Sequence, residues 1–250
     1  TLTWPWLGYW GSMMGCNANA VWSEVCRDIN VGVGAPAERQ IITGSPSLDG
    51  LEAASDVDVH EALGLDPARK IVLMLGSHRP PVKGPADALF LKALAAYGER
   101  DDVVFVHKPH PVEVSHGSVL AMPEGVVTTM DQDLYLPLVR HAAVVLSPAT
   151  SVVIPALAFR TPFINTIRPA DGAAPPEEVT ALLALLKGAV FAFDDLSAIL
   201  DDGLRPDEAA CQRAFARLGH RADGKNGARV AALARWMADG GAPQAWTDAE

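Results

Sequence analysis

The sequence predicts an α/β fold built on a doubly wound parallel sheet. From Arg69 onward, short β-branched runs alternate with stretches of helical periodicity, which is typical of parallel strands joined by crossover helices. The run Val103–Val106 is apolar at four consecutive positions, as expected of a strand covered on both faces. Of the 250 residues, 49% are hydrophobic and 20% are charged, so the chain can bury a sizeable core. We therefore expect a soluble globular protein.

The expected elements follow one another along the chain, each set by its own pattern. The expected strands are 20–23, 41–46, 70–75, 103–106, 126–129, 143–146, 163–167 and 190–193. The expected helices are 85–97, 134–141, 151–159, 175–188 and 228–238, and further helices close the chain. The helix at residue 175 begins with two prolines and two glutamates, which suit a first turn, and Gly188 ends it.

The first residues are rich in aromatic side chains, and four of the six tryptophans lie within residues 1–26. We expect Trp4, Trp6, Tyr9 and Trp10 to be packing anchors rather than a platform that stacks on sugars. If uncovered, they would form an apolar patch of the size found at interfaces. Residues 1–45 are therefore expected to be the end of a preceding domain and a linker, and residues 46–250 the main domain. An upstream domain or a second copy of the chain would cover the aromatic stretch.

Charge and cysteine content narrow the range of partners and compartments. The formal net charge is −10 and Lys and Arg form no cluster, which argues against nucleic-acid binding. The three cysteines are too few and too widely spaced for a zinc site or a disulfide framework, which favours a reducing cytoplasm. The sequence shows no transmembrane or signal-like segment. We expect a cytoplasmic protein, with the inner face of the membrane as one place where it could work.

The apolar strand that begins at Val103 stops at Lys108-Pro-His-Pro111, because prolines cannot donate to a strand ladder. Lys108 and His110 would then lie at the carboxyl end of a parallel strand, where ligands bind in open α/β sheets. A cation beside an imidazole there indicates an anionic ligand such as a phosphate. The alternative is an ordinary strand end with solvated polar residues.

Loops of the same kind follow two other expected strands. After strand 70–75, Gly76 lets a ligand approach the backbone, and Ser77, His78 and Arg79 offer hydrogen-bond donors. Strand 143–146 runs directly into a helix whose start carries Ser147, Thr150 and Ser151. Free amides at a helix start bind phosphate, although hydroxyls there can also simply cap the helix. Because the three loops would meet at one edge of the sheet, we expect them to bind a phosphate together.

The order of these motifs carries a family resemblance. A strand ending in Gly-x-His-Arg is followed by Lys-Pro-His-Pro, then by a Ser/Thr-rich turn with Arg160-Thr-Pro-Phe163, and finally by an Asp-Gly-Lys...Arg-Val helix. This order resembles the C-terminal nucleotide-binding domain of GT-B glycosyltransferases. The group includes UDP-N-acetylglucosamine 2-epimerases, CDP-glycerol glycerophosphotransferases and capsule-type Kdo or sialyl transferases. The segment Ile42–Asp49 also resembles the interdomain segment of this group, and the likeness runs from about residue 20 to residue 238.

The resemblance implies a Rossmann-like GT-B half that follows the remnant of a preceding domain. Its ligand would be a nucleotide-activated donor, CMP-, CDP- or UDP-linked, with a glycan as acceptor and no separate cofactor. His110 would be the catalytic residue, because it would stabilise the charge that develops on the departing phosphate. The implied phosphate-binding residues are Gly76, Ser77, His78, Arg79, Lys108, His110, Pro111, Ser147, Thr150 and Ser151.

One position departs from the group. The epimerases and related transferases carry a carboxylate that grips the ribose near Ile154-Pro155, and this chain has none there. Three functions therefore stay open: a transferase in capsule, cell-wall or surface polysaccharide synthesis, a UDP-sugar 2-epimerase, and a non-catalytic nucleotide-binding or scaffold module. We expect no metal site, because the histidines outside the loops lack the spacing of metal ligands; they are His60, His107, His116, His141 and His220.

Overall fold

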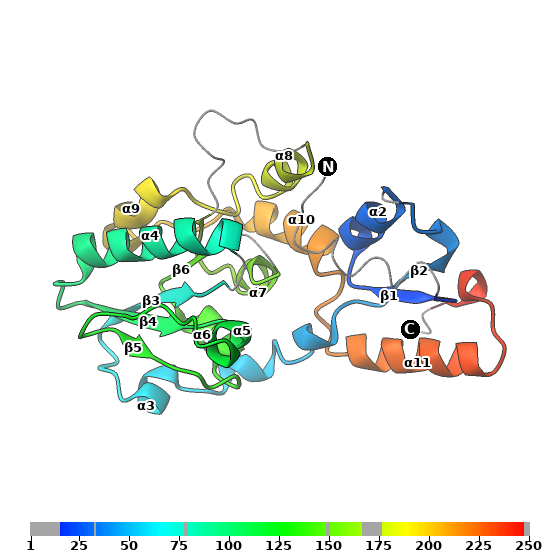
Figure 1. The fold of residues 1–250 in the computed structure, drawn as a ribbon, viewed down its shortest axis with the longest axis horizontal. Coiled ribbons are helices and arrows are strands. Elements are labelled where there is room, and N and C mark those ends of the chain that lie inside the picture. Colours follow the sequence, from blue (N-terminus) through cyan, green and yellow to red (C-terminus); the bar gives the residue numbers. More distant parts are fainter. Residues whose placement is uncertain (1–15, 33, 78–79, 149–150, 167–176, 248–250) are drawn as a thin grey trace. The chain divides into compact units, whose positions relative to one another are not determined.

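The computed structural model describes residues 16–32, 34–77, 80–148, 151–166 and 177–247 (Figure 1). The chain divides into two compact units, one made of residues 1–52 and 213–250 and the other of residues 53–212. Among the helices described, none is long and apolar enough to cross a membrane. The aromatic stretch before residue 16 lies outside the described residues, so the assignment of residues 1–45 to a preceding domain stays a prediction.

The larger unit is built on one parallel sheet. Its strands are β3 (Lys70–Leu75), β4 (Val103–Lys108), β5 (Val127–Thr128), β6 (Val144–Ser147) and β7 (Phe163–Asn165). They lie in the order β5-β4-β3-β6-β7, and every neighbouring pair is parallel. The first strand lies in the middle, and the chain adds strands on one side of it and then on the other. This doubly wound, Rossmann-like order confirms the predicted fold class.

Both faces of this sheet are covered. Helix α4 (Pro80–Tyr97) runs alongside the sheet, as Figure 1 shows. On that face Val72 and Met74 of β3 share one buried cluster with Phe90 of α4 and with α9 (Leu196–Asp201). The alternate residue Leu73 points to the opposite face, where α6 (Tyr135–His141) contacts β3, and it is 0% exposed. A strand buried on both faces must be apolar at consecutive positions, which is why the apolar runs predicted these strands.

The remaining helices of this unit are α3 (Val59–Leu63), α5 (Pro111–Ser115), α7 (Val153–Phe159) and α8 (Glu177–Leu185), and α10 (Glu208–Leu218) begins in this unit and continues past its last residue, 212. The helix expected at 85–97 begins earlier, at Pro80, because prolines fit a first helical turn. The strand expected at 190–193 is wrong. Isolated bridges pair Phe191 with Ile164 and Val190 with Lys187, and Phe193 already begins a 3-10 turn that ends at Asp195.

The smaller unit contains β1 (Asn19–Val21), α2 (Glu24–Gly32), β2 (Gln40–Ile42) and α11 (Asn226–Ala238). Strands β1 and β2 pair in parallel. The side-chain amide oxygen of Gln40 accepts hydrogen bonds from the amides of Asn19 and Asn30, at 2.8 and 2.6 Å. One polar side chain thereby ties β1, α2 and β2 together.

Two segments that are distant in the sequence meet in this unit. The carboxylate of Asp49 accepts hydrogen bonds from the backbone N–H groups of Asn226 and Gly227, at 2.9 and 2.7 Å, at the positive end of α11. Gly44 has a φ of +80°, and a Cβ added there would lie 1.9 Å from Oδ1 of Asn226. The segment Ile42–Asp49 and the start of α11, both part of the family resemblance, therefore hold each other in place.

We expect Gly44→Ala to destabilise the chain more than Gly34→Ala. Gly34 also has a positive φ, of +98°, but a Cβ there would meet nothing within 4 Å. Both variants carry a backbone cost of about 1 to 2 kcal/mol, and overpacking against Asn226 adds about 1 to 3 kcal/mol at residue 44. Urea denaturation measures both, and equal losses of unfolding free energy would contradict the close contact with Asn226.

Candidate functional site

The predicted site residues lie at the carboxyl edge of the parallel sheet. Gly76 and Ser77 follow β3, His110 follows β4 shortly after its end, and Ser147 is the last residue of β6. The direction of winding reverses between β3 and β6, and ligands of open α/β sheets bind beyond the strand ends at such a reversal. The structure therefore brings the three predicted loops to the edge where this fold binds ligands.

The imidazole of His110 is held in one tautomer. His110 is the residue that caps the start of α5, and its Nδ1 accepts a hydrogen bond from the backbone N–H of Val112 at 3.1 Å. A nitrogen that accepts a hydrogen bond carries no proton, so in the neutral ring the proton lies on Nε2. Pro111 fills the first helical position, where its fixed φ suits the turn. His110 thus presents Nε2–H as a hydrogen-bond donor.

A buried carboxylate contacts the backbone of the His110 loop. Glu113 of α5 has a side chain that is 1% exposed, and its Oε2 accepts a hydrogen bond from the backbone N–H of His110 at 2.8 Å. A Cβ added at Gly76 would lie 2.0 Å from this Oε2 and 3.0 Å from the backbone nitrogen of His110. Glycine is thus required at residue 76 because the carboxylate approaches it closely, and the loops after β3 and β4 touch there.

The carboxylate of Glu113 is paired with Lys83 of α4. The ammonium of Lys83 lies 2.5 Å from Oε1 of Glu113 and 3.0 Å from Asp87, one helical turn further on. Burial acts to lower the pKa of Lys83, but the hydrogen bonds to Glu113 and Asp87 outweigh it and hold this pKa above its usual value. Burial also raises the pKa of Asp87. The charge of Glu113 is therefore compensated inside the fold, as a buried charge requires.

His107 and Lys108 are buried in the sheet, as the last two residues of β4. Burial lowers the pKa of His107 to about 4, and its Nδ1 has no hydrogen-bond partner in the described part of the chain. The ammonium of Lys108 donates to the backbone carbonyl of Asp131 at 2.7 Å, and burial lowers its pKa. Lys108 thus already fixes the loop after β5, and its phosphate contact stays a prediction.

The end of β6 carries a buried hydroxyl. Ser147 is 0% exposed, and its Oγ makes no hydrogen bond within the described residues. Its carbonyl accepts the N–H of Thr166 at 3.0 Å, and Oγ1 of Thr166 is likewise buried without a partner. Val152 stands at the cap of α7, and its apolar side chain makes no capping hydrogen bond. Capping of α7 therefore does not account for the hydroxyls of Ser147 and Ser151.

The structure brings Gly76 close to the backbone of His110, with Pro111 next in the chain and with Ser77 and Ser147 at the same sheet edge. His78, Arg79 and Thr150 lie outside the described residues, so their roles stay predictions. Glu113 is the residue that sequence reasoning missed. Its signal was its position three residues after His110 at a helix start, the spacing of a capping box, which the structure shows to be formed.

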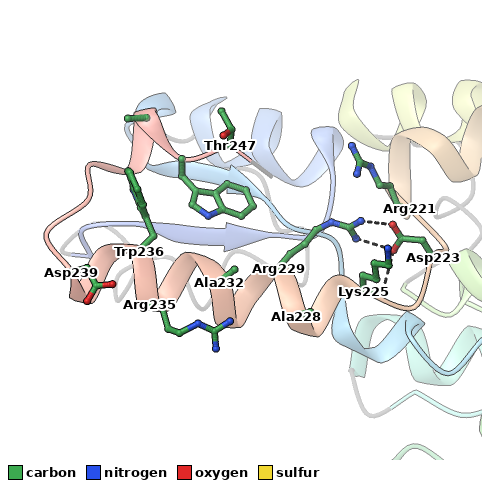
Figure 2. A pocket seen from close by; sticks show the side chains of 12 residues that line it. Arg221, Asp223, Lys225, Ala228, Arg229, Ala232, Arg235, Trp236, Asp239 and Thr247 are labelled. Atoms are coloured by element: carbon green, nitrogen blue, oxygen red, sulfur yellow. Dashed lines mark hydrogen bonds and ion pairs between the residues drawn. The ribbon is translucent and has the colours of Figure 1, made fainter. Parts of the chain in front are cut away.

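The smaller unit has a pocket of about 770 Å³ of its own (Figure 2). It runs along α11 past the side chains of Arg235 and Trp236, and its lining includes none of the predicted site residues that the structure describes. At one end Arg229 forms a two-pronged ion pair with Asp223, which holds the pKa of that carboxyl well below its usual range. The Asp-Gly-Lys...Arg motif therefore has a structural role at the start of α11. In the described residues, no three His, Cys, Asp or Glu side chains are grouped to hold a metal ion.

No protein-family model matches the sequence, and no curated protein matches it either. Solved structures do match the fold. The MnaA–UDP co-structure from S. aureus is 13% identical, with a TM-score of 0.60 over 90% of this chain and 61% of that chain. The UDP-GlcNAc 2-epimerase from Neisseria meningitidis, bound to UDP-GlcNAc, is 16% identical, with a TM-score of 0.56 over 88% and 62%. The wall teichoic acid polymerase TagF is 15% identical, with a TM-score of 0.61 over 90% and 58%.

These similarities confirm the resemblance that the motif order indicated. A 2-epimerase and a teichoic acid polymerase both share the fold of this chain, which is that of GT-B enzymes. The chain spans about three fifths of the length of the matched structures. At this level of identity the similarity shows the fold, and the site itself must supply the argument for function.

We expect His107 to make the chain less stable in acid. Because its folded pKa is about 4 and its ordinary value 6.5, the unfolded chain binds the proton more readily between these values. Stability is therefore lost as the pH falls through that window, by at most about 3 kcal/mol. His107→Leu should remove this loss in chemical denaturation from pH 7 to pH 4. His116→Gln, at an exposed position, is the control, and an unchanged pH profile in His107→Leu would show that other groups cause the loss.

We expect Ser147→Ala and Thr166→Val to keep or raise the stability of the chain. Each change removes a buried hydroxyl that has no partner within the described residues, and such a group costs about 1 to 3 kcal/mol of desolvation. Thermal melting in the absence of ligand measures the effect. A clear loss of stability in Ser147→Ala would mean that the hydroxyl is already bonded inside the folded chain.

Proposed function

We propose that this chain is the nucleotide-binding part of a GT-B transferase. The enzyme would move a sugar or a glycerol-phosphate-like group from a CMP-, CDP- or UDP-linked donor to a glycan acceptor. Its place would be in the synthesis of capsule, cell-wall or other surface polysaccharide, on the cytoplasmic side. The observation that supports this most is the meeting of the Gly76 and His110 loops, one strand away from the buried hydroxyl of Ser147.

The loops after β4 and β6 offer hydrogen-bond donors of the kind that a phosphate needs. Nε2–H of His110 and the hydroxyl of Ser147 can each donate to a phosphate oxygen. The hydroxyl of Ser147 is buried without a partner in the described residues, and a ligand oxygen would satisfy it. Gly76 keeps the loop after β3 close to His110, so that donors from neighbouring strands converge.

The chemistry of the proposed reaction is electrostatic. When the bond between the transferred group and the nucleotide breaks, negative charge accumulates on the phosphate that leaves. A donor that is already oriented toward that phosphate stabilises the transition state without having to reorganise. His110 is suited to this role because its capping hydrogen bond fixes the ring before the ligand binds.

The interior of α7 bears on which nucleotide donor the chain would take. Ile154 is 6% exposed and Pro155 is also buried, so this part of the helix is apolar and packs into the fold. The ribose-gripping carboxylate that the 2-epimerases and related transferases carry has no counterpart there. A nucleotide donor other than a UDP-sugar fits this arrangement better. A nucleotide-binding chain without turnover would indicate the non-catalytic alternative.

We expect His110→Asn to weaken binding of CMP, CDP, UMP or UDP while leaving the fold intact. Asn can still cap α5 through its side-chain oxygen, but it lacks Nε2–H. The expected loss is about 1 to 3 kcal/mol of binding free energy, the usual range for a hydrogen bond to a charged group. Isothermal calorimetry at up to millimolar nucleotide, together with thermal melting, separates binding from stability.

His116→Ala is the matched control for this prediction. His116 is an exposed imidazole at the other end of the same short helix, so its removal should leave affinity unchanged. If the parent chain binds none of the four nucleotides, the proposed function is wrong. If His110→Asn binds as well as the parent chain, His110 does not contact the phosphate.

A further inference from the structure

We propose that Glu113 is a positioning residue for His110, and that its pairing with Lys83 keeps it in that role. The inference rests on the proposed function insofar as His110 is to contact a phosphate. It concerns a residue that does not itself reach the ligand. Glu113 acts through the backbone and ring orientation of His110, by way of three contacts that the structure describes.

The first contact is with the backbone of His110. Oε2 of Glu113 accepts the N–H of His110 at 2.8 Å, while Nδ1 of His110 accepts the N–H of Val112 at 3.1 Å. The two hydrogen bonds are the reciprocal halves of one capping box, so each depends on the same backbone geometry. If the carboxylate moves, the backbone of His110 moves, and the bond that fixes the tautomer of its ring is lost.

The second contact is with the loop after β3. Gly76 does not have a positive φ, so its glycine is not explained by backbone conformation. It is explained by space, because the carboxylate of Glu113 occupies the volume that a Cβ at residue 76 would need. The carboxylate of Glu113 therefore sets the distance between the loop that contains Gly76 and the loop that contains His110.

The third contact anchors the carboxylate itself. Glu113 would be free to choose among rotamers if its charge were solvated, but its side chain is 1% exposed and Oε1 is bonded to Lys83. Lys83 belongs to α4, and its ammonium is held from a second side by Asp87. The long helix α4 thus fixes Glu113, and Glu113 fixes His110.

The test is a double-mutant cycle with two independent readouts. Glu113→Gln keeps the shape of the side chain but removes the charge. Its single acceptor oxygen can serve either the Lys83 ammonium or the N–H of His110, so its NH2 group must face the other donor. Lys83→Met removes the ammonium and leaves the carboxylate uncompensated. We expect each single variant to weaken nucleotide binding about tenfold. The fold-loss of affinity in the double variant should be smaller than the product of the two single fold-losses. Exposed Glu124→Gln and Lys92→Met, the latter also on α4, are the matched controls and should bind as the parent chain does.

A second background separates positioning from general damage. In His110→Asn the imidazole is absent, so adding Glu113→Gln should weaken nucleotide binding by less than about twofold further, because its target is gone. A loss as large in this background as in the parent chain would overturn the inference, since Glu113 would then act by another route.

The ring of His110 gives a readout that needs no nucleotide. Nitrogen-15 NMR of the histidine rings, assigned with His110→Asn, should show protonation on Nε2 in the parent chain at pH 8. In Glu113→Gln we expect a mixture of the two tautomers. An unchanged Nε2–H tautomer in that variant would contradict the positioning role. If the parent chain failed to bind nucleotide, the proposed function would fall, while the tautomer would still decide the role of Glu113.

Discussion

The parallel direction of the strands determines where the loops and the covering helices of the larger unit lie. Because all five strands point the same way, their carboxyl ends lie along one edge, and the loops that leave them are neighbours although they are far apart in the sequence. Such a sheet also needs cover on both faces, which α4 and α9 provide on one side and α6 contributes on the other. The same requirement brings Lys83 of α4 close to the loops.

The fold could be predicted because its strands are buried on both faces. Val103–Val106 and residues 70–75 are recognisable as strands without any knowledge of their neighbours. The exact ends of the strands were harder to predict from the sequence. β4 continues through His107 and Lys108 because these residues pair with Met74 and Leu75 of β3, and a pairing partner cannot be deduced from the run itself. Phe191 looks like part of a strand, yet the chain turns away after a single bridge to Ile164.

The position of the candidate loops at the sheet edge could be predicted from the sequence, whereas the side-chain contacts that hold them could not. The prolines beside His110 and the glycine after β3 marked the loops correctly. Gly76 was interpreted as room for a ligand, and the structure shows that a carboxylate from the chain itself fills that space. Glu113 and Lys83 are thirty residues apart, so their pairing depends on how α4 packs against the sheet. Lys108, which comes two residues before His110, donates to the carbonyl of Asp131, a contact that the sequence did not indicate.

The contact between Gly76 and Glu113 also constrains how homologous chains can diverge. A side chain larger than hydrogen at residue 76 cannot coexist with a carboxylate that lies 2.0 Å from the Cβ position. The two positions must therefore change together during evolution. A lineage that replaced the glycine would first have to shorten or lose the acid at residue 113, and Lys83 would then be left with Asp87 as its counter-charge. Residues 76, 83 and 113, which lie on separate elements, would therefore be expected to covary among homologous chains.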